Sequence, residues 1–162
     1  MKVYHCSTHS YNVGDTIKKG KWGNFIKNKY SNEQQAWMEF YFESIRKTIV
    51  PIPTSRFDCV FAFDDINIAE GFTIGNDKKI YEIDLDENNT YSTHNYKVIS
   101  LFVGLLKIPY SSSNFPMLFD NLNLIEKYWK GDETDYITFE DFDIGYQKEY
   151  LISTDVTVTK VY

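Results

Sequence analysis

The sequence predicts an α+β domain in which a curved, mostly antiparallel sheet has helices packed against it. Three observations support this fold class. Short apolar runs typical of strands occur at both ends of the chain and in its middle. Two longer segments, residues 32–49 and 116–130, repeat apolar residues at helical spacing. The prolines are few and lie outside the expected strands, as a hydrogen-bonded sheet requires.

The N-terminal half is expected to begin with a strand and to contain one long helix. That helix spans about residues 32–49, because Ser31 or Asn32 can cap its first turn. Pro51 and Pro53 end it, since proline lacks the N–H that a continuing helix needs. The other expected elements are a strand at 3–6, a short helix at 14–20 ended by Gly20 and Gly23, a strand at 57–63, and a short helix at 66–72 capped by Asp64 or Asp65.

The C-terminal half is expected to end in a pair of strands. Residues 98–106 fit either a strand or a helix, because the run is uniformly apolar. A second good helix spans about 116–130, with Asn114 as its cap and Gly131 at its end. The remaining expected elements are a strand at 79–85, a turn at 86–89, an acidic loop at 132–146, and closing strands at 149–153 and 156–162 around a tight turn.

Length and charge narrow the classes of function. A chain of 162 residues is expected to form one domain, residues 1–162. The net charge of −6 argues against a dedicated nucleic-acid-binding protein. Its two cysteines form no disulfide framework, and its longest apolar run, 98–106, is too short for a membrane span, so a soluble cytoplasmic protein is expected. An early group of lysines could still meet a polyanion: Lys18, Lys19, Lys21, Lys27 and Lys29.

Several catalytic signatures are missing from the sequence. It has no metal-ligand spacing of the His-x-x-x-His or Cys-x-x-Cys kind, so no metal is expected. It also lacks a Walker-type phosphate loop and a Gly-x-Ser-x-Gly nucleophile turn. A two-histidine phosphoesterase needs two His-x-Ser/Thr motifs. His5 and Ser7 supply one, but the position two residues after His94 holds Tyr96 and not serine or threonine.

Four short segments, in this order, carry a resemblance to a known superfamily. They are residues 4–8 (Tyr-His-Cys-Ser-Thr) with Ile17 and Gly20, residues 55–63, residues 69–72 followed by 80–83, and residues 149–152 with Val156. Together they resemble the ADP-ribosyltransferase-like fold superfamily, of the small bacterial or phage toxin and modifier type. The resemblance implies a split-sheet fold and a mono-ADP-ribosyltransferase that uses NAD as its substrate. Its acceptor would be a protein or, through the early lysines, RNA or DNA.

The resemblance also implies roles for particular residues at the C-terminal end. Glu149 would be the carboxylate that stabilises the oxocarbenium-like ribose as nicotinamide leaves. Gln147 would contact the acceptor. Residues two apart on an extended strand point to the same side, so both could meet one substrate. An ordinary edge-strand glutamate and an ordinary loop glutamine are the alternatives.

The cofactor-binding roles fall on the first strand and the middle of the chain. His5 and Ser7, which share a strand face, would bind a ribose. Arg56 would hold the diphosphate of NAD with its guanidinium group, and Phe61 or Phe63 would stack on nicotinamide. The alternatives are a histidine bonded to a backbone carbonyl, a structural salt bridge of the arginine, and aromatic side chains in the core.

The subclass and the acceptor stay open. Members with Gln-x-Glu normally carry arginine on the first strand, where this chain has His5, and the Ser-Thr-Ser strand motif is missing. Members that start with histidine commonly have a spaced tyrosine pair in mid-chain, which Tyr81 and Tyr91 match only approximately, because a turn-rich stretch lies between them. A non-catalytic module of phage or bacterial origin that inhibits a host protein is the alternative function. Its exposed anchors would be Trp22, Tyr128 and Trp129, although a core position is the favoured alternative for Trp129.

Overall fold

The structure, a computed structural model, describes all residues except 29–32, 76, 107–121, 132–137 and 140–141. The described residues form an antiparallel seven-stranded sheet and five α-helices, which confirms the α+β prediction. A split sheet of ADP-ribosyltransferase type stays a prediction. Among the described helices, none has both the length and the apolar character needed to cross a bilayer.

The described chain divides into two compact units, and each contains several separate segments. One unit, called the sheet unit, comprises residues 1–24, 54–93 and 149–162. The other, called the helical unit, comprises residues 25–53 and 94–148. The expectation of one domain from 1 to 162 stays a prediction.

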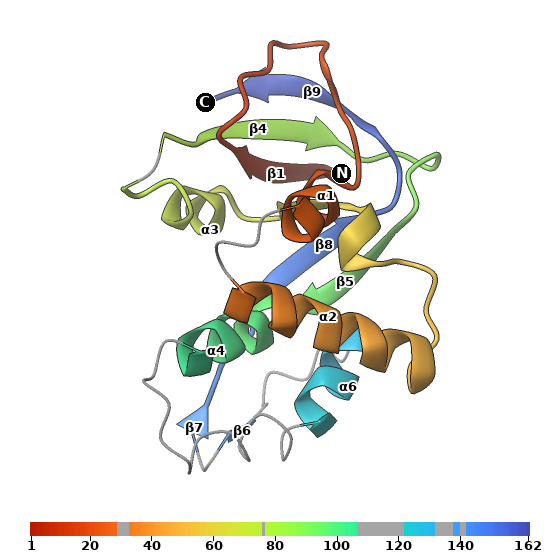
Figure 1. Ribbon diagram of the computed structural model, residues 1–162. Coiled ribbons are helices and arrows are strands. Elements are labelled where there is room, and N and C mark those ends of the chain that lie inside the picture. The colour runs from red at the N-terminus through yellow and green to blue at the C-terminus, as the bar shows by residue number, and fades with distance from the viewer. Residues whose placement is uncertain (29–32, 76, 107–121, 132–137, 140–141) are drawn as a thin grey trace. The chain divides into compact units, whose positions relative to one another are not determined.

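The sheet is not ordered along the chain, because strands from both termini lie beside strands from the middle. Its order is β2-β9-β4-β1-β3-β8-β5. The N-terminal strand β1 is therefore central, with β4 and β9 beside it on one side (Figure 1). The strands are β1 (Lys2–Ser7), β2 (Thr16–Ile17), β3 (Val60–Phe63), β4 (Lys79–Asp84), β5 (Tyr91–Asn95), β8 (Lys148–Ile152) and β9 (Val156–Val161).

The register of three neighbouring strands decides which side chains share a face. Tyr4 of β1 lies opposite Phe63 of β3, and Phe63 lies opposite Glu149 of β8. Directly opposed residues of antiparallel strands point to the same side of a sheet. Tyr4, Phe63 and Glu149 therefore line one face. Their sequence neighbours on each strand point to the other face, because side chains alternate along a strand.

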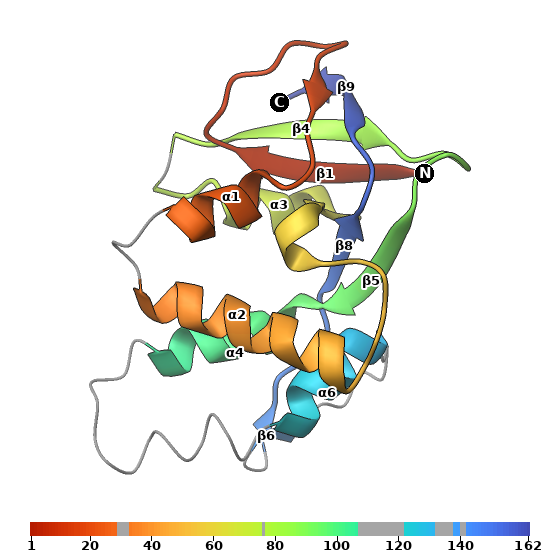
Figure 2. The same cartoon turned by 45° about the vertical axis from the view of Figure 1, so that its right-hand side comes forward.

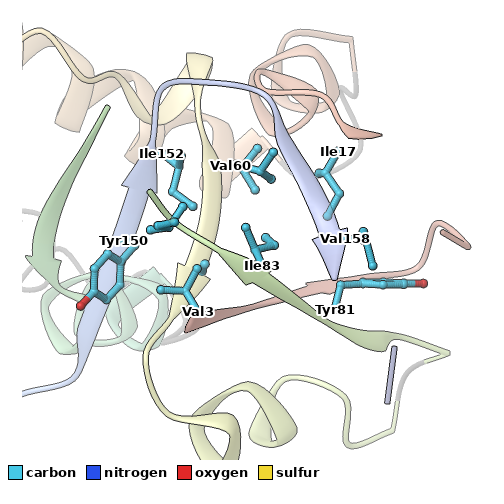
Figure 3. Close-up of a cluster of buried hydrophobic side chains, with 11 residues drawn as sticks. Val3, Ile17, Val60, Tyr81, Ile83, Tyr150, Ile152 and Val158 are labelled. Carbon is cyan, nitrogen blue, oxygen red and sulfur yellow. The ribbon is translucent and has the colours of Figure 1, made fainter. Parts of the chain in front are cut away.

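The second face carries the hydrophobic core of the sheet unit. Figure 3 shows side chains from β1, β3, β4, β8 and β9 meeting there, with the Tyr81 ring at the edge of the cluster. All of them are almost fully buried. The cluster comprises Val3, Ile17, Val60, Ala62, Tyr81, Ile83, Leu85, Tyr150, Ile152, Val156 and Val158.

A short helix, α3 (Ile66–Gly71), covers part of the first face. Asp65, one of the two caps that the sequence allows, accepts a hydrogen bond from the Asn67 backbone N–H at 2.8 Å. The Cys6 thiol of β1 donates to the Ala69 carbonyl oxygen at 3.1 Å. Burial raises the pKa of Cys6 to about 11, so this thiol stays protonated and unreactive at neutral pH.

The helical unit is built on three helices, α2 (Glu33–Thr48), α4 (Tyr96–Leu106) and α6 (Leu122–Lys130), which pack against one another (Figure 2). Phe42 of α2 meets Phe102 and Tyr128 edge to face, with ring centroids 5.2 and 5.4 Å apart. The Trp129 indole N–H donates to the Phe42 carbonyl at 2.7 Å. A two-stranded sheet of β6 (Thr138–Phe139) and β7 (Phe142–Asp143) also belongs to this unit.

Most expected elements are confirmed, and the corrections lie where local patterns are weakest. The helix expected at 14–20 is wrong: Thr16–Ile17 form β2, and the helix α1 (Lys21–Asn28) starts after Gly20, whose φ of 77° favours glycine. The ambiguous run 98–106 is helical, within α4. The strands β5, β6 and β7 have no counterpart among the expected elements, and the strand expected at 57–63 begins only at Val60, after a 3₁₀ turn. The start of the helix expected at 116–130 and its cap Asn114 lie outside the described residues, as do the expected caps Ser31 and Asn32 of the long helix.

Candidate functional site

The carboxylate of Glu149 is engaged by the guanidinium group of Arg56. Arg56 Nη1 donates to Glu149 Oε2 at 2.7 Å, and the two residues are only 4% and 1% exposed. The strand β8 positions Glu149, and a 3₁₀ turn at Arg56–Asp58 positions the arginine. Ser55 caps this turn by accepting from the Phe57 N–H at 3.1 Å. The two residues expected to hold different parts of NAD therefore bind each other.

The phenylalanines of β3 accompany this ion pair on the same sheet face. The Arg56 guanidinium carbon lies 4.7 Å from the centroid of the Phe61 ring, close enough for a cation–π contact. Trp22 approaches the same ring edge-on, at 6.4 Å. Phe63 stacks on Phe72 at 4.8 Å. Phe63 is therefore a buried core residue, whereas Phe61 packs between the Arg56 guanidinium group and the Trp22 indole ring.

His5 is held by a backbone group of the neighbouring strand. Its Nδ1 lies 2.8 Å from the Phe61 carbonyl oxygen, and because a carbonyl only accepts, Nδ1 carries the proton. Burial lowers the pKa of His5 to about 4, although the Phe61 bond opposes this shift. At neutral pH the ring is therefore uncharged, and its Nε2 keeps a lone pair that can accept a hydrogen bond.

The register does not bring His5 and Glu149 to one side of the sheet. Glu149 shares a face with Tyr4, so His5, the next residue along β1, points to the opposite face. His5 lies directly across from Tyr81 of β4, a member of the core cluster on that face. His5, which would bind a ribose, and Glu149, which would stabilise the ribosyl cation, therefore lie on opposite faces of the sheet, and the register does not bring them to one ribose. Ser7 shares the His5 face, and its hydroxyl accepts from the His9 N–H at 3.1 Å.

Aromatic and cationic side chains surround His5. The Tyr81 ring lies 6.5 Å from the imidazole and meets the Tyr11 ring edge to face at 5.1 Å. Tyr81 also donates its hydroxyl to the His9 carbonyl at 2.7 Å, which ties the loop after β1 to β4. We call the following set the His5 cluster: His5, His9, Tyr11, Lys21, Lys78 and Tyr81.

The sequence indicates only part of this cluster. It points to Tyr81 through an approximate tyrosine pair and to Lys21 through a run of lysines, and it gives no signal at Tyr11 or Lys78. The available signal is the alternation of 79–85, which places Tyr81 on the same side of its strand as Ile83. That pattern does not specify which strand lies beside it.

Gln147 belongs to the helical unit, and its backbone is fixed there. Its N–H donates to the Asn95 side-chain oxygen at 3.1 Å, and its carbonyl accepts from the Tyr96 N–H at 2.8 Å. The side chain is half-buried. Its expected contact with an acceptor stays a prediction.

The early lysines do not form a uniform basic surface. Lys18 pairs with Asp155 at 2.8 Å, and Lys19 pairs with Asp58 at 2.7 Å. Lys21 instead donates to the Tyr11 hydroxyl. Lys29 lies outside the described residues. Two of the lysines expected to meet a polyanion are therefore already matched by carboxylates.

The anchors expected for a binding module are not exposed. Tyr128 and Trp129 are 0% and 1% exposed, because both lie in the helical core. Trp22 is half-buried against Phe61. The prediction of an exposed anchor is therefore wrong for Tyr128 and Trp129, and the alternative core position of Trp129 is confirmed.

The described part of the chain contains no group of three or more His, Cys, Asp or Glu side chains arranged to hold a metal ion. Comparison with models of protein families gives no match, and comparison with curated protein sequences gives none either.

Proposed function

We propose that this chain binds NAD, with His5 as the residue that orients a ribose. The observation that carries this proposal is the state of the His5 ring. Its Nδ1–H is used by the Phe61 carbonyl, so a neutral Nε2 remains as an acceptor for a ribose hydroxyl. The half-buried Tyr11 ring, which packs edge to face against the buried Tyr81 ring, supplies the flat apolar surface that a nucleotide ring needs.

Removing the imidazole tests this proposal directly. His5→Ala is expected to weaken NAD binding about tenfold, the scale of one hydrogen bond lost from a partly buried site. Isothermal titration calorimetry gives the dissociation constant, and circular dichroism checks the fold of the variant. Thr8→Ala is the matched control, because Thr8 is exposed and lies three residues after His5. No NAD binding by the native chain, or equal binding by His5→Ala, overturns the proposal.

The pH dependence gives a second check that needs no change at His5. Because the pKa of His5 is about 4, its neutral form persists down to about pH 5. NAD affinity is expected to be constant between pH 7.5 and about 5.5, and to fall only as Nε2 becomes protonated near the pKa. A His9→Asn background removes the other histidine of the cluster. A tenfold loss of affinity centred near the usual histidine pKa of about 6.5 would contradict the assignment.

Transfer of ADP-ribose is the second candidate, and the buried Glu149 carboxylate favours it. A buried charged group in contact with one specific partner is more common at functional sites than elsewhere. Transfer would break the bond between ribose C1′ and nicotinamide, which leaves with the bonding electrons, and an acceptor nucleophile would take its place. His5 and Glu149 lie on opposite faces of the sheet. For this reason NAD binding is the primary proposal, and transfer of ADP-ribose is the second.

Nicotinamide release from labelled NAD, measured with a cell lysate as the source of acceptor, tests the second candidate. Glu149→Gln keeps the shape of the side chain and an oxygen for Arg56 to bind, but removes the negative charge. If Glu149 stabilises the ribosyl cation, release is expected to fall roughly a hundredfold. Equal release by the native chain and by Glu149→Gln rules out this role.

A further inference from the structure

The charged groups that act on His5 are cationic. Lys21 and Lys78 each lower the pKa of its ring, in addition to the larger effect of burial. This is unusual in a chain of net charge −6, where Lys2, Lys18 and Lys19 each pair with a carboxylate. Within the described residues, no carboxylate pairs with Lys21 or Lys78. The His5 cluster is therefore a locally positive site in an acidic protein.

The aromatic side chains of the cluster hold one of these lysines in place. Lys21 Nζ donates to the Tyr11 hydroxyl at 2.5 Å and lies 4.8 Å from the centroid of that ring. The exposed His9 ring stacks on Tyr11, with centroids 6.3 Å apart and planes inclined by 26°. A cation thus lies beside a short stack of flat rings.

Lys78 approaches the same end of the strand from another segment. It precedes β4, and its charge acts on both His5 and Cys6 of β1. Lys79, the next residue, lies directly opposite Ser7, the last residue of β1. The backbone of Lys78 therefore lies beside the C-terminal end of β1, where the loop carrying His9 and Tyr11 begins.

We propose that Lys21 and Lys78 bind the phosphate group of a nucleoside phosphate whose planar base extends the His9–Tyr11 stack. This inference rests on the proposed NAD site, and it names the part of the ligand that these residues recognise. Two ammonium groups without a carboxylate partner among the described residues attract a phosphate. A flat base gains contact with exposed aromatic rings whatever its identity. The site is expected to accept nucleoside 5′-phosphates as a class and to bind nucleosides weakly.

Ligand titrations followed by isothermal calorimetry or by NMR of the labelled full chain test this. The probes are ADP-ribose, AMP, adenosine and inorganic phosphate. AMP is expected to bind at least tenfold more tightly than either adenosine or inorganic phosphate, because only AMP uses both parts of the site. Lys21→Ala and Lys78→Ala are each expected to weaken AMP binding about tenfold, a loss of one charge-assisted contact.

Two further variants test whether the loss of affinity comes from the lost lysine charge at this site or from a general effect of substitution. Lys21→Arg keeps the charge and is expected to retain most of the affinity. Lys97→Ala removes an exposed lysine from the helical unit, so it changes the net charge equally and should leave AMP binding unchanged.

The outcomes distinguish this inference from the proposed function. If AMP binds through Lys21 and Lys78 while NAD does not bind, the inference stands and the NAD proposal fails. If NAD binds through His5 and neither lysine variant weakens it, the inference is overturned and the NAD proposal stands. Adenosine binding as tightly as AMP also overturns the inference.

Discussion

Glu149→Ala is expected to lower the free energy of unfolding by about 3–5 kcal/mol, the cost of removing one partner from a buried ion pair. Glu149 and Arg56 are almost fully buried and joined at 2.7 Å. Removing the carboxylate leaves the guanidinium charge in a poorly solvated place, where water cannot replace the lost partner. Chemical denaturation measures the effect, as a lower midpoint with an unchanged slope.

A double variant and an exposed pair provide the controls. Arg56→Met combined with Glu149→Leu removes both charges, so most of the lost stability is expected to return. Lys19→Ala breaks an ion pair of the same 2.7 Å length, but its side chains are 38% and 61% exposed. That change is expected to cost less than about 1 kcal/mol. A cost for Glu149→Ala as small as that for Lys19→Ala would show that the buried pair is not a structural element.

The structural role of this ion pair also bears on function. If Glu149→Ala unfolds the sheet unit, loss of activity in that variant says nothing about catalysis. Glu149→Gln is therefore the informative variant for the transfer reaction, because it retains an oxygen acceptor for Arg56. Activity and unfolding should be measured on the same preparations.

Gly23→Ala is expected to destabilise the chain by about 3 kcal/mol, at the upper end of the usual cost of overpacking. A Cβ atom at Gly23 would lie 2.1 Å from the Phe57 carbonyl oxygen and 2.8 Å from its carbonyl carbon. Both are backbone atoms, which cannot rotate away as a side chain can. Gly23 is in the first turn of α1, so this close approach packs the start of the helix against the 3₁₀ turn that contains Arg56.

Gly71→Ala is the matched control for this prediction. It lies at the end of α3 in the same unit, and a Cβ atom added there would meet nothing within 4 Å among the described residues. Its replacement is expected to be neutral or slightly stabilising, because alanine favours a helix more than glycine does. Thermal denaturation of both variants measures the difference. Equal stability of Gly23→Ala and the native chain would contradict the packing described for α1.

The helices and strands with strong local signals are predictable from the sequence. The helix α2 follows from apolar spacing and from Pro51 and Pro53 after its end, and α3 follows from the cap at Asp65. The strand β5 escapes prediction because Tyr91–Asn95 is polar and has no alternation of apolar residues. The helix prediction for 14–20 is wrong because the two-residue strand there depends on β9, which is about 140 positions further along the chain.

The sequence predicts which residues belong to the candidate site, but not which of them contact each other. The sequence identifies His5, Arg56 and Glu149 as unusual, and all three make specific contacts. It does not show that Arg56 binds Glu149 across 93 positions, because nothing in either local segment specifies the partner. A structural salt bridge of Arg56 is one of the interpretations that the sequence leaves open, and it is the one the structure contains.

By itself the sequence determined the α+β class, the long helix, the central strands and the residue types that could bind a nucleotide, because caps, prolines and periodicity are local properties. Only the tertiary structure decided which face each strand residue occupies, since a shift of one residue in strand pairing moves every side chain to the other side. The register of β1, β3 and β8 therefore placed His5 with Tyr81 and Glu149 with Arg56.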